Sequence, residues 1–230
     1  MEEFMKNFFA TPTDEWGNNA VRLTSTGILT IIIVIIILII IALASNYSKS
    51  KSRKLTTKQL VFSAVAIALS IITSMIKLFE MPMGGSVTLL SMLFIVLIGY
   101  WYGPYVGIMT AIAYGLLQFV LEPIFYTVPQ MLTDYPLAFG ALGISGFFYQ
   151  KKYGLVKGYI AAVFGRYFFA FLSGVIFFAS YAPESMAAPI YSLVYNGSYL
   201  GAEAVITLIL ISMPPVSKAL KQIKRLTSEE

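Results

Sequence analysis

The chain has 230 residues, of which 58% are hydrophobic and 12% are charged, and its mean hydropathy is +0.78. Soluble domains carry about 25% charged residues, so this composition indicates a protein that lies mostly in lipid. The absence of Cys and His excludes thiolate chemistry and disulfides and removes the commonest metal ligand and the usual general base. The net charge of +5 does not indicate nucleic-acid binding, because the Lys and Arg residues cluster beside apolar runs. We therefore expect no catalytic residue, metal site or cofactor.

The N-terminal section, residues 1–57, is predicted to contain one membrane helix. Residues 1–26 are polar, and residues 27–44 form an unbroken Ile-rich run that is long enough to span a bilayer. The chain lacks the basic n-region and the small-residue cleavage site of a signal peptide here, so we expect a retained transmembrane helix. The dense basic cluster at 48–54 predicts that the side after this helix is cytosolic.

Six further apolar runs follow in residues 58–213, and they are long and mostly uncharged, as helical spans require. The predicted helices are 58–79, 87–102, 105–121, 130–149, 158–180 and 190–212. Of the connections between them, the Pro- and Gly-rich loop at 81–86 is expected to be an ordered turn. The fold class is therefore an all-α, polytopic membrane helix bundle, which is followed by a basic tail at 214–230.

The distribution of Lys and Arg predicts how the bundle is oriented. The basic connections all fall on one side, and the loops on the other side contain neither residue type. Cytosolic loops are enriched in Lys and Arg. The sequence therefore predicts seven spans in the plasma membrane, with the N-terminus outside and the C-terminus in the cytosol.

Arg166 places a cation inside an apolar run. An ionisable group at membrane depth usually faces a polar cavity or a partner. Helical spacing places two further kinds of residue on the same helix face as Arg166. Small residues come first, at Ala170 and Ser173/Gly174, and aromatic residues follow, at Phe177/Phe178. This face could line a pocket for a small, flat, polar molecule. Alternatively, Arg166 snorkels to the cytosolic headgroups and the aromatic side chains face lipid.

A second polar group contains an acid. Gln130 and Asp134 are one helical turn apart, and Tyr135 lies beside them. Asp134 is near the outer end of its predicted helix, so it can reach a cavity that opens to the outside. A carboxylate among aromatic rings suits a cationic ring compound. The alternative is an ion pair with Arg166 that only closes the bundle.

Two other features leave their roles open. Asn196 and Glu203 share a helix face, and Glu203 is either a second functional acid or a hydrogen-bond partner of a neighbouring helix. Ala64 and Ala68 form a small-xxx-small pair that lets another helix approach closely. That helix belongs either to this chain or to a separate membrane subunit.

Four blocks together resemble a known family, the thiamine-specific substrate-binding (S) components of energy-coupling factor (ECF) transporters. They are MPMGGSVTLLSML (81–93), PQMLTDYPLAFGALGISGFF (129–148), RYFFAFLSGVIFFASYAP (166–183) and IYSLVYNGSY (190–199). The resemblance covers about residues 58–212. It implies a six-helix bundle with a ligand pocket that faces outward under the first loop, so the helix at 27–44 is an addition. It also implies thiamine as ligand, no ATPase activity, and docking on a membrane coupling protein and two ATP-binding subunits.

The resemblance also implies functional residues. Asp134 matches an acidic residue that pairs with thiamine, Arg166 matches a basic pocket position, and Phe178 matches an aromatic residue that stacks on the ligand. The predicted substrate-binding residues are Gly84, Gly85, Gln130, Asp134, Tyr135, Arg166, Gly174, Phe178, Tyr191 and Asn196. Ala64 and Ala68 are the predicted docking residues.

The chain also departs from the family pattern. The family often has a His at the position of Ala170, a His-Pro pair at 127–128 and a Pro at Phe94, and it has no counterpart of Glu203. A missing ring at Ala170 could cost about 1–2 kcal/mol of ligand binding. A pyridoxine-like vitamin or hydroxymethylpyrimidine is therefore an alternative ligand.

Two other classes of function fit the sequence less well. A self-sufficient secondary transporter would use Asp134, Arg166 and Glu203 as a proton relay, but such proteins normally show inverted repeats, which we do not find. The favoured class, an importer driven by ATP, needs a partner that binds ATP, because this chain has no Walker motif. A membrane enzyme is disfavoured by the absence of His, Cys and a recognisable nucleophile constellation.

Overall fold

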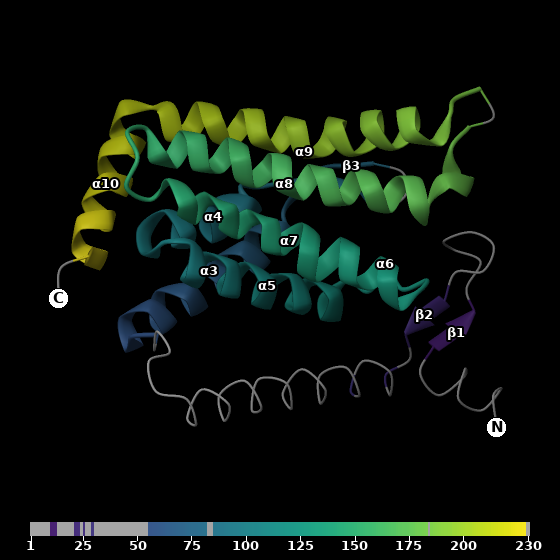
Figure 1. Cartoon of the computed structure of the whole chain (residues 1–230), viewed down its shortest axis with the longest axis horizontal. Helices are drawn as coiled ribbons and strands as arrows, with labels where there is room; N and C mark the ends of the chain where they lie inside the picture. Colours follow the sequence, from purple (N-terminus) through teal and green to yellow (C-terminus); the bar gives the residue numbers. More distant parts are fainter. Residues whose placement is uncertain are drawn as a thin grey trace.

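The computed structural model describes residues 10–12, 21–23, 25, 29, 55–81, 85–183 and 185–228. In these residues, helices pack side by side as a bundle, and two short antiparallel strand pairs accompany them (Figure 1). The predicted span at 27–44 lies outside the described residues except for Leu29, and Gly84 lies outside them too. The expectations for both therefore stay predictions.

The bundle is built from five long or medium helices and one composite segment. The helices are α3 (Thr57–Ser74), α4 (Ser91–Tyr102), α5 (Pro104–Leu121), α8 (Gly154–Ile176) and α9 (Ala188–Ser212). The predicted basic tail forms a further helix, α10 (Pro214–Ser228), which lies across one end of the bundle (Figure 1). The strand pairs are β1 (Ala10–Pro12) with β2 (Val21–Leu23), and β3 (Lys77–Glu80) with β4 (Ser86–Thr88).

Of the described helices, α3, α5, α8 and α9 are long and apolar enough to cross a membrane. Helix α4 is apolar but has only 12 residues. A helical bundle of the multi-pass membrane type, as predicted, is therefore confirmed. The number of spans stays a prediction.

Local sequence explains where several helices begin. Thr56 and Gln59 form a reciprocal capping box at the start of α3, which satisfies backbone N–H groups that have no partner within the helix. Helix α5 begins with Pro104, whose missing N–H is not needed in the first turn. Gly103 precedes it with φ of +90°, a conformation that Gly adopts without the steric cost of a side chain. The chain can therefore reverse sharply between α4 and α5.

The predicted single helix at 130–149 is irregular. It consists of α6 (Val128–Leu132), a π-helical turn η2 (Thr133–Leu137), α7 (Ala138–Gly140) and a 3₁₀ segment η3 (Ala141–Phe148). Pro136 lies inside η2 and has no N–H to donate, so the regular i→i−4 pattern is interrupted. The N–H of Ala138 instead donates to the Thr133 carbonyl five residues earlier. The π turn places Asp134 and Tyr135 on an enlarged helical turn.

The predicted helices at 58–79 and 87–102 are shorter than expected, because strands replace one end of each. Strand β3 pairs with β4 in an antiparallel hairpin, on either side of the loop that is predicted to be an ordered turn. Lys77 at the start of β3 forms ion pairs with Glu80 at 3.1 Å and with Glu122, which follows α5, at 3.2 Å. The hairpin is thereby tied to the end of α5.

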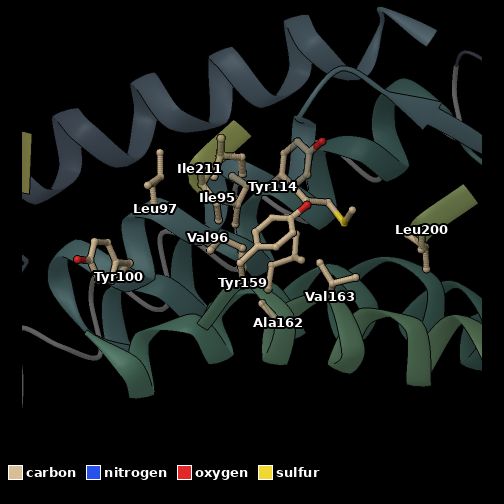
Figure 2. Close-up of a cluster of buried hydrophobic side chains, with 14 residues drawn as sticks. Ile95, Val96, Leu97, Tyr100, Tyr114, Tyr159, Ala162, Val163, Leu200 and Ile211 are labelled. Carbon is tan, nitrogen blue, oxygen red and sulfur yellow. The ribbon is translucent and has the colours of Figure 1, made fainter. Parts of the chain in front are cut away.

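The hydrophobic core surrounds α4, most of whose residues are buried. Such an apolar helix with no polar face is expected at the centre of a bundle rather than at its surface. Figure 2 shows the rings of Tyr114 from α5 and Tyr159 from α8 in one cluster with Ile95 and Val96 from α4. The core thus joins the two halves of the chain.

Glycines let these central segments approach closely. A Cβ atom on Gly143 would lie 2.4 Å from the Ile108 Cα, and one on Gly107 would lie 2.6 Å from the Gly99 Cα. Small residues at helix contacts allow this backbone-to-backbone packing in membrane proteins. The backbones of α4, α5 and η3 are therefore tightly packed against one another.

Candidate ligand-binding cavity

A cavity of about 1050 Å³ lies between the β3–β4 hairpin, α5, η2, α7, α8 and the first half of α9. Its lining residues on α9 lie between Tyr191 and Glu203, whereas α10 follows the other end of this helix (Figure 1). Small-molecule sites commonly measure about 300–1,000 Å³. The cavity is therefore large enough for a ligand of vitamin size together with water.

Asp134 lies on the cavity wall and is half-buried. Gln130 Nε2 donates a hydrogen bond of 2.6 Å to its Oδ2. The described residues provide no such bond of ordinary geometry to Oδ1. One carboxylate oxygen, Oδ2, is therefore positioned by Gln130.

Gln130 is fully buried and does not belong to the cavity wall. Besides its bond to Asp134, its amide donates to the Ile124 carbonyl at 3.2 Å and accepts from the Tyr126 N–H at 3.0 Å. Its position does not support the prediction that it contacts substrate. Its hydrogen bonds go to the Asp134 carboxylate and to the backbone of Ile124 and Tyr126. Gln130 therefore orients Asp134 and the connection after α5.

Tyr135 contributes its ring to the cavity and its hydroxyl to the scaffold. The hydroxyl donates to the Glu122 carbonyl at 2.7 Å and accepts from the Ile124 N–H at 2.9 Å. Its ring stacks on Phe139, with centroids 6.4 Å apart. The residue therefore presents an apolar wall next to Asp134.

Arg166 lines the cavity from α8. Its guanidinium carbon lies 4.1 Å from the centroid of the Phe139 ring, a cation–π contact. The alternative ion pair with Asp134 does not form: within the described part of the chain, the ion pairs are those of Lys77. The cation and the carboxylate are both left facing the same cavity.

Part of the predicted face of α8 lies on the cavity wall. Ala170, Ser173 and Gly174 line the cavity, but α8 ends at Ile176, so Phe178 lies beyond the helix. Phe178 still lines the cavity, and its ring packs edge-on against Tyr126, with centroids 5.2 Å apart.

Gly174 also has a packing role. A Cβ atom there would lie 2.1 Å from Ser192 Oγ on α9. The buried Ser173 hydroxyl beside it has no hydrogen-bond partner among the described residues. At this point α8 and α9 cross too closely for a larger residue than Gly.

Asn196 bridges α8 and α9. Its Nδ2 donates to the carbonyls of Ala170 at 3.3 Å and Ser192 at 3.0 Å, and its Oδ1 accepts from the Tyr199 hydroxyl at 2.9 Å. It lines the cavity, but most of its amide is engaged by protein groups. It therefore stabilises the helix crossing as well as the wall.

A stripe of tyrosines from α9 completes the wall. Tyr191 stacks on Tyr195, with centroids 5.6 Å apart, and Tyr199 packs against Tyr195 at 5.8 Å. The N–H of Gly85 donates to the Tyr195 hydroxyl at 2.8 Å, which joins the hairpin to α9. The sequence prediction omitted Tyr195 and Tyr199, although the i, i+4, i+8 spacing with Tyr191 could have identified this face.

Glu203 is 3% exposed, and protein donors surround it. Its Oε2 accepts hydrogen bonds from the Thr88 hydroxyl at 2.6 Å and the Thr88 N–H at 3.2 Å. Its Oε1 accepts from the Ser91 hydroxyl and the Met92 N–H, both at 3.2 Å. Of the two alternatives for this residue, the structure shows hydrogen bonding to a neighbouring helix. Asp134, in contrast, accepts one such hydrogen bond from the described residues, at Oδ2.

The geometry defines a class of protein: a membrane helix bundle with an internal, aromatic-walled cavity that offers a carboxylate, a guanidinium and amide groups to a small molecule. The thiamine transporter protein family matches residues 60–223 of this chain, and the chain belongs to that family. The resemblance found in the sequence blocks is thereby confirmed.

Individual relatives agree with this assignment. The chain is 35% identical over 167 residues to the thiamine transporter ThiT of Bacillus subtilis, which covers 66% of this chain and 85% of the relative. It is 28% identical over 127 residues to ThiT of Lacticaseibacillus paracasei, which covers 49% and 61%. A solved structure of ThiT from Listeria monocytogenes has the same fold, with a TM-score of 0.54 and 24% identity, over 69% of this chain and 93% of that one. The family consists of transporters and is not known to be enzymatic, in agreement with the prediction that the chain is not an enzyme.

Proposed function

We propose that this chain is the substrate-binding subunit of an ECF-type importer, which captures thiamine outside the cell and delivers it inward when docked on an ATP-driven coupling module. The observation that carries the proposal is the Asp134 carboxylate in an aromatic-walled cavity, where Oδ1 accepts no hydrogen bond of ordinary geometry from the described residues. The relatives named as thiamine transporters support thiamine as the ligand.

The chemistry of thiamine fits the groups on the wall. Thiamine joins an aminopyrimidine, which carries N–H donors, to a cationic thiazolium ring. Asp134 Oδ1 can accept from an amino group, and a charged acceptor makes such a bond stronger than a neutral one. The stacked rings of Tyr191 and Tyr195 offer faces that attract a cationic ring.

The surface of α3 supports docking of a partner subunit. Ala64 and Ala68 are exposed, and larger apolar side chains beside them, such as Leu60 and Val65, are also exposed. Small exposed residues on a membrane helix let a second helix approach closely. We propose that the coupling protein docks there and that two ATP-binding subunits supply the energy.

The proposed orientation has the N-terminus outside and the C-terminus in the cytosol. The basic residues of α10, including Lys218, Lys221 and Arg225, then lie on the cytosolic side, as positive-inside topology requires. The cavity, which lies away from α10, then opens toward the outside. This is the side from which an importer takes its substrate.

The first test is a titration of the purified, detergent-solubilised chain with thiamine, followed by intrinsic Trp and Tyr fluorescence. Pyridoxine and hydroxymethylpyrimidine serve as comparison ligands. Saturable binding of thiamine at much lower concentration than either comparison ligand would support the proposal. Tight binding of a comparison ligand without thiamine binding would change the assigned substrate.

A second test separates an ATP-driven importer from a proton-coupled transporter. Proteoliposomes containing the chain alone should bind thiamine without accumulating it, and addition of the coupling protein and ATP-binding subunits should make uptake depend on ATP. Uptake by the chain alone that stops when the proton gradient collapses would contradict the proposal. The full engagement of Glu203 by four protein donors already disfavours a relay through that residue.

A further inference from the structure

The segment 85–88, which contains strand β4 and forms part of the cavity wall, is joined to α9 at two points. The Gly85 N–H bonds to the Tyr195 hydroxyl at 2.8 Å, and Thr88 bonds to Glu203 through both its N–H and its hydroxyl. Tyr195 and Glu203 are separated by about 12 Å along a helix, and Gly85 and Thr88 by about 10 Å along a strand. The two spacings nearly match, so β4 runs alongside α9 and is held near both ends.

Glu203 also completes the start of α4. The residue before this helix, Leu90, has a left-handed backbone with φ of +63° and offers no side-chain cap. The N–H of Met92, in the first turn, would otherwise lack an acceptor, and it donates to Glu203 instead. A carboxylate at a helix N-terminus is favoured by the helix dipole. A residue of α9 therefore caps α4, a helix more than a hundred positions earlier in the chain.

We infer that Glu203 is a positioning residue for ligand binding: its carboxylate holds the β4–α4 junction, and with it the Gly85–Ser91 side of the cavity, in the place where the ligand is bound. The residues that it holds, Thr88 and Ser91, line the cavity themselves. Glu203 lines the cavity as well, but its oxygens accept hydrogen bonds from protein donors, so it acts on the ligand through this wall. The inference rests on the proposed function, because it assigns a role within that binding site.

The discriminating variant is Glu203→Gln, which has nearly the same shape but presents an amide NH₂ to groups that are themselves donors. The matched control is Thr207→Val. Thr207 lies one turn further along α9 and is fully buried, and its hydroxyl donates to the Glu203 carbonyl of its own helix. Hydrogen–deuterium exchange of the ligand-free protein and the rate constants for thiamine binding are measured for the wild type and both variants.

We expect Glu203→Gln to increase amide exchange at 85–93 without increasing it in the middle of α9. The same variant should raise the dissociation rate of thiamine about tenfold, because a charge-assisted hydrogen-bond network is lost. The association rate should change much less, and Thr207→Val should leave both measurements close to wild type. A general loss of stability would instead increase exchange throughout the bundle.

Exchange at 85–93 that matches wild type in Glu203→Gln would overturn the inference. So would increased exchange with a dissociation rate within twofold of wild type. If Glu203→Gln does not fold, Thr88→Val, which removes the donor of the shortest bond, is judged by the same two measurements. If wild-type protein does not bind thiamine, the proposed function fails, and the exchange result in the ligand-free protein still decides whether Glu203 anchors the wall.

Discussion

Replacement of Asp134 by Asn tests the role of the carboxylate oxygen Oδ1 with little change of shape. Gln130 Nε2 points at Oδ2 as a donor, so the amide oxygen of the substituted side chain should turn toward Gln130. The NH₂ group would then face the cavity at the place of Oδ1. A ligand amino group would meet a donor instead of a charged acceptor.

The size of the effect follows from this exchange of groups. A hydrogen bond to a charged group contributes about 1.5–3 kcal/mol. Each 1.4 kcal/mol corresponds to a factor of ten, so the Kd for thiamine should rise about 10- to 100-fold. Isothermal titration calorimetry of the purified variant measures this change, and thermal unfolding checks that the variant is folded.

Glu80→Gln is the matched control, because Glu80 is an exposed carboxylate of the hairpin outside the cavity wall. Its removal should change the Kd less than threefold, since exposed ion pairs contribute about 0–1 kcal/mol. A folded Asp134→Asn variant with the Kd of the wild type would refute the assignment of Asp134 as the ligand acceptor. Equal losses in both variants would indicate a general effect of charge.

Two further predictions concern packing and docking. Gly143→Ala should lower the free energy of unfolding by about 1–3 kcal/mol, because its Cβ atom would lie 2.4 Å from the Ile108 Cα. Gly201→Ala, whose Cβ atom meets no atom within 4 Å, should not lower it. Equal losses of stability in both variants, measured by thermal unfolding, would contradict this packing. Ala64→Trp or Ala68→Trp should leave the Kd for thiamine unchanged but block co-purification with the coupling protein. Normal assembly of both variants would contradict the assignment of this surface of α3 as the docking face.

The sequence by itself was sufficient for the fold class and the family. The long apolar runs predict membrane helices because an unpaired backbone group is too costly in lipid, and α5 and α9 lie close to their predicted bounds. The same local patterns identified Asp134 and Arg166 as polar groups at membrane depth. Periodicity also placed Ala170 and Gly174 on a common face, which lines the cavity.

Only the tertiary structure distinguished the surroundings of the two acids. Asp134 and Glu203 are both single carboxylates in apolar helices. Glu203 accepts hydrogen bonds from donors 111 to 115 positions away, whereas Asp134 Oδ2 accepts one from Gln130, four positions away. Likewise, the sequence could not show that Arg166 stacks on Phe139 instead of pairing with Asp134. Helical periodicity reports which residues share a face of one element. Hydrogen bonds between distant elements depend on how those faces meet, and this is decided by packing of the whole bundle.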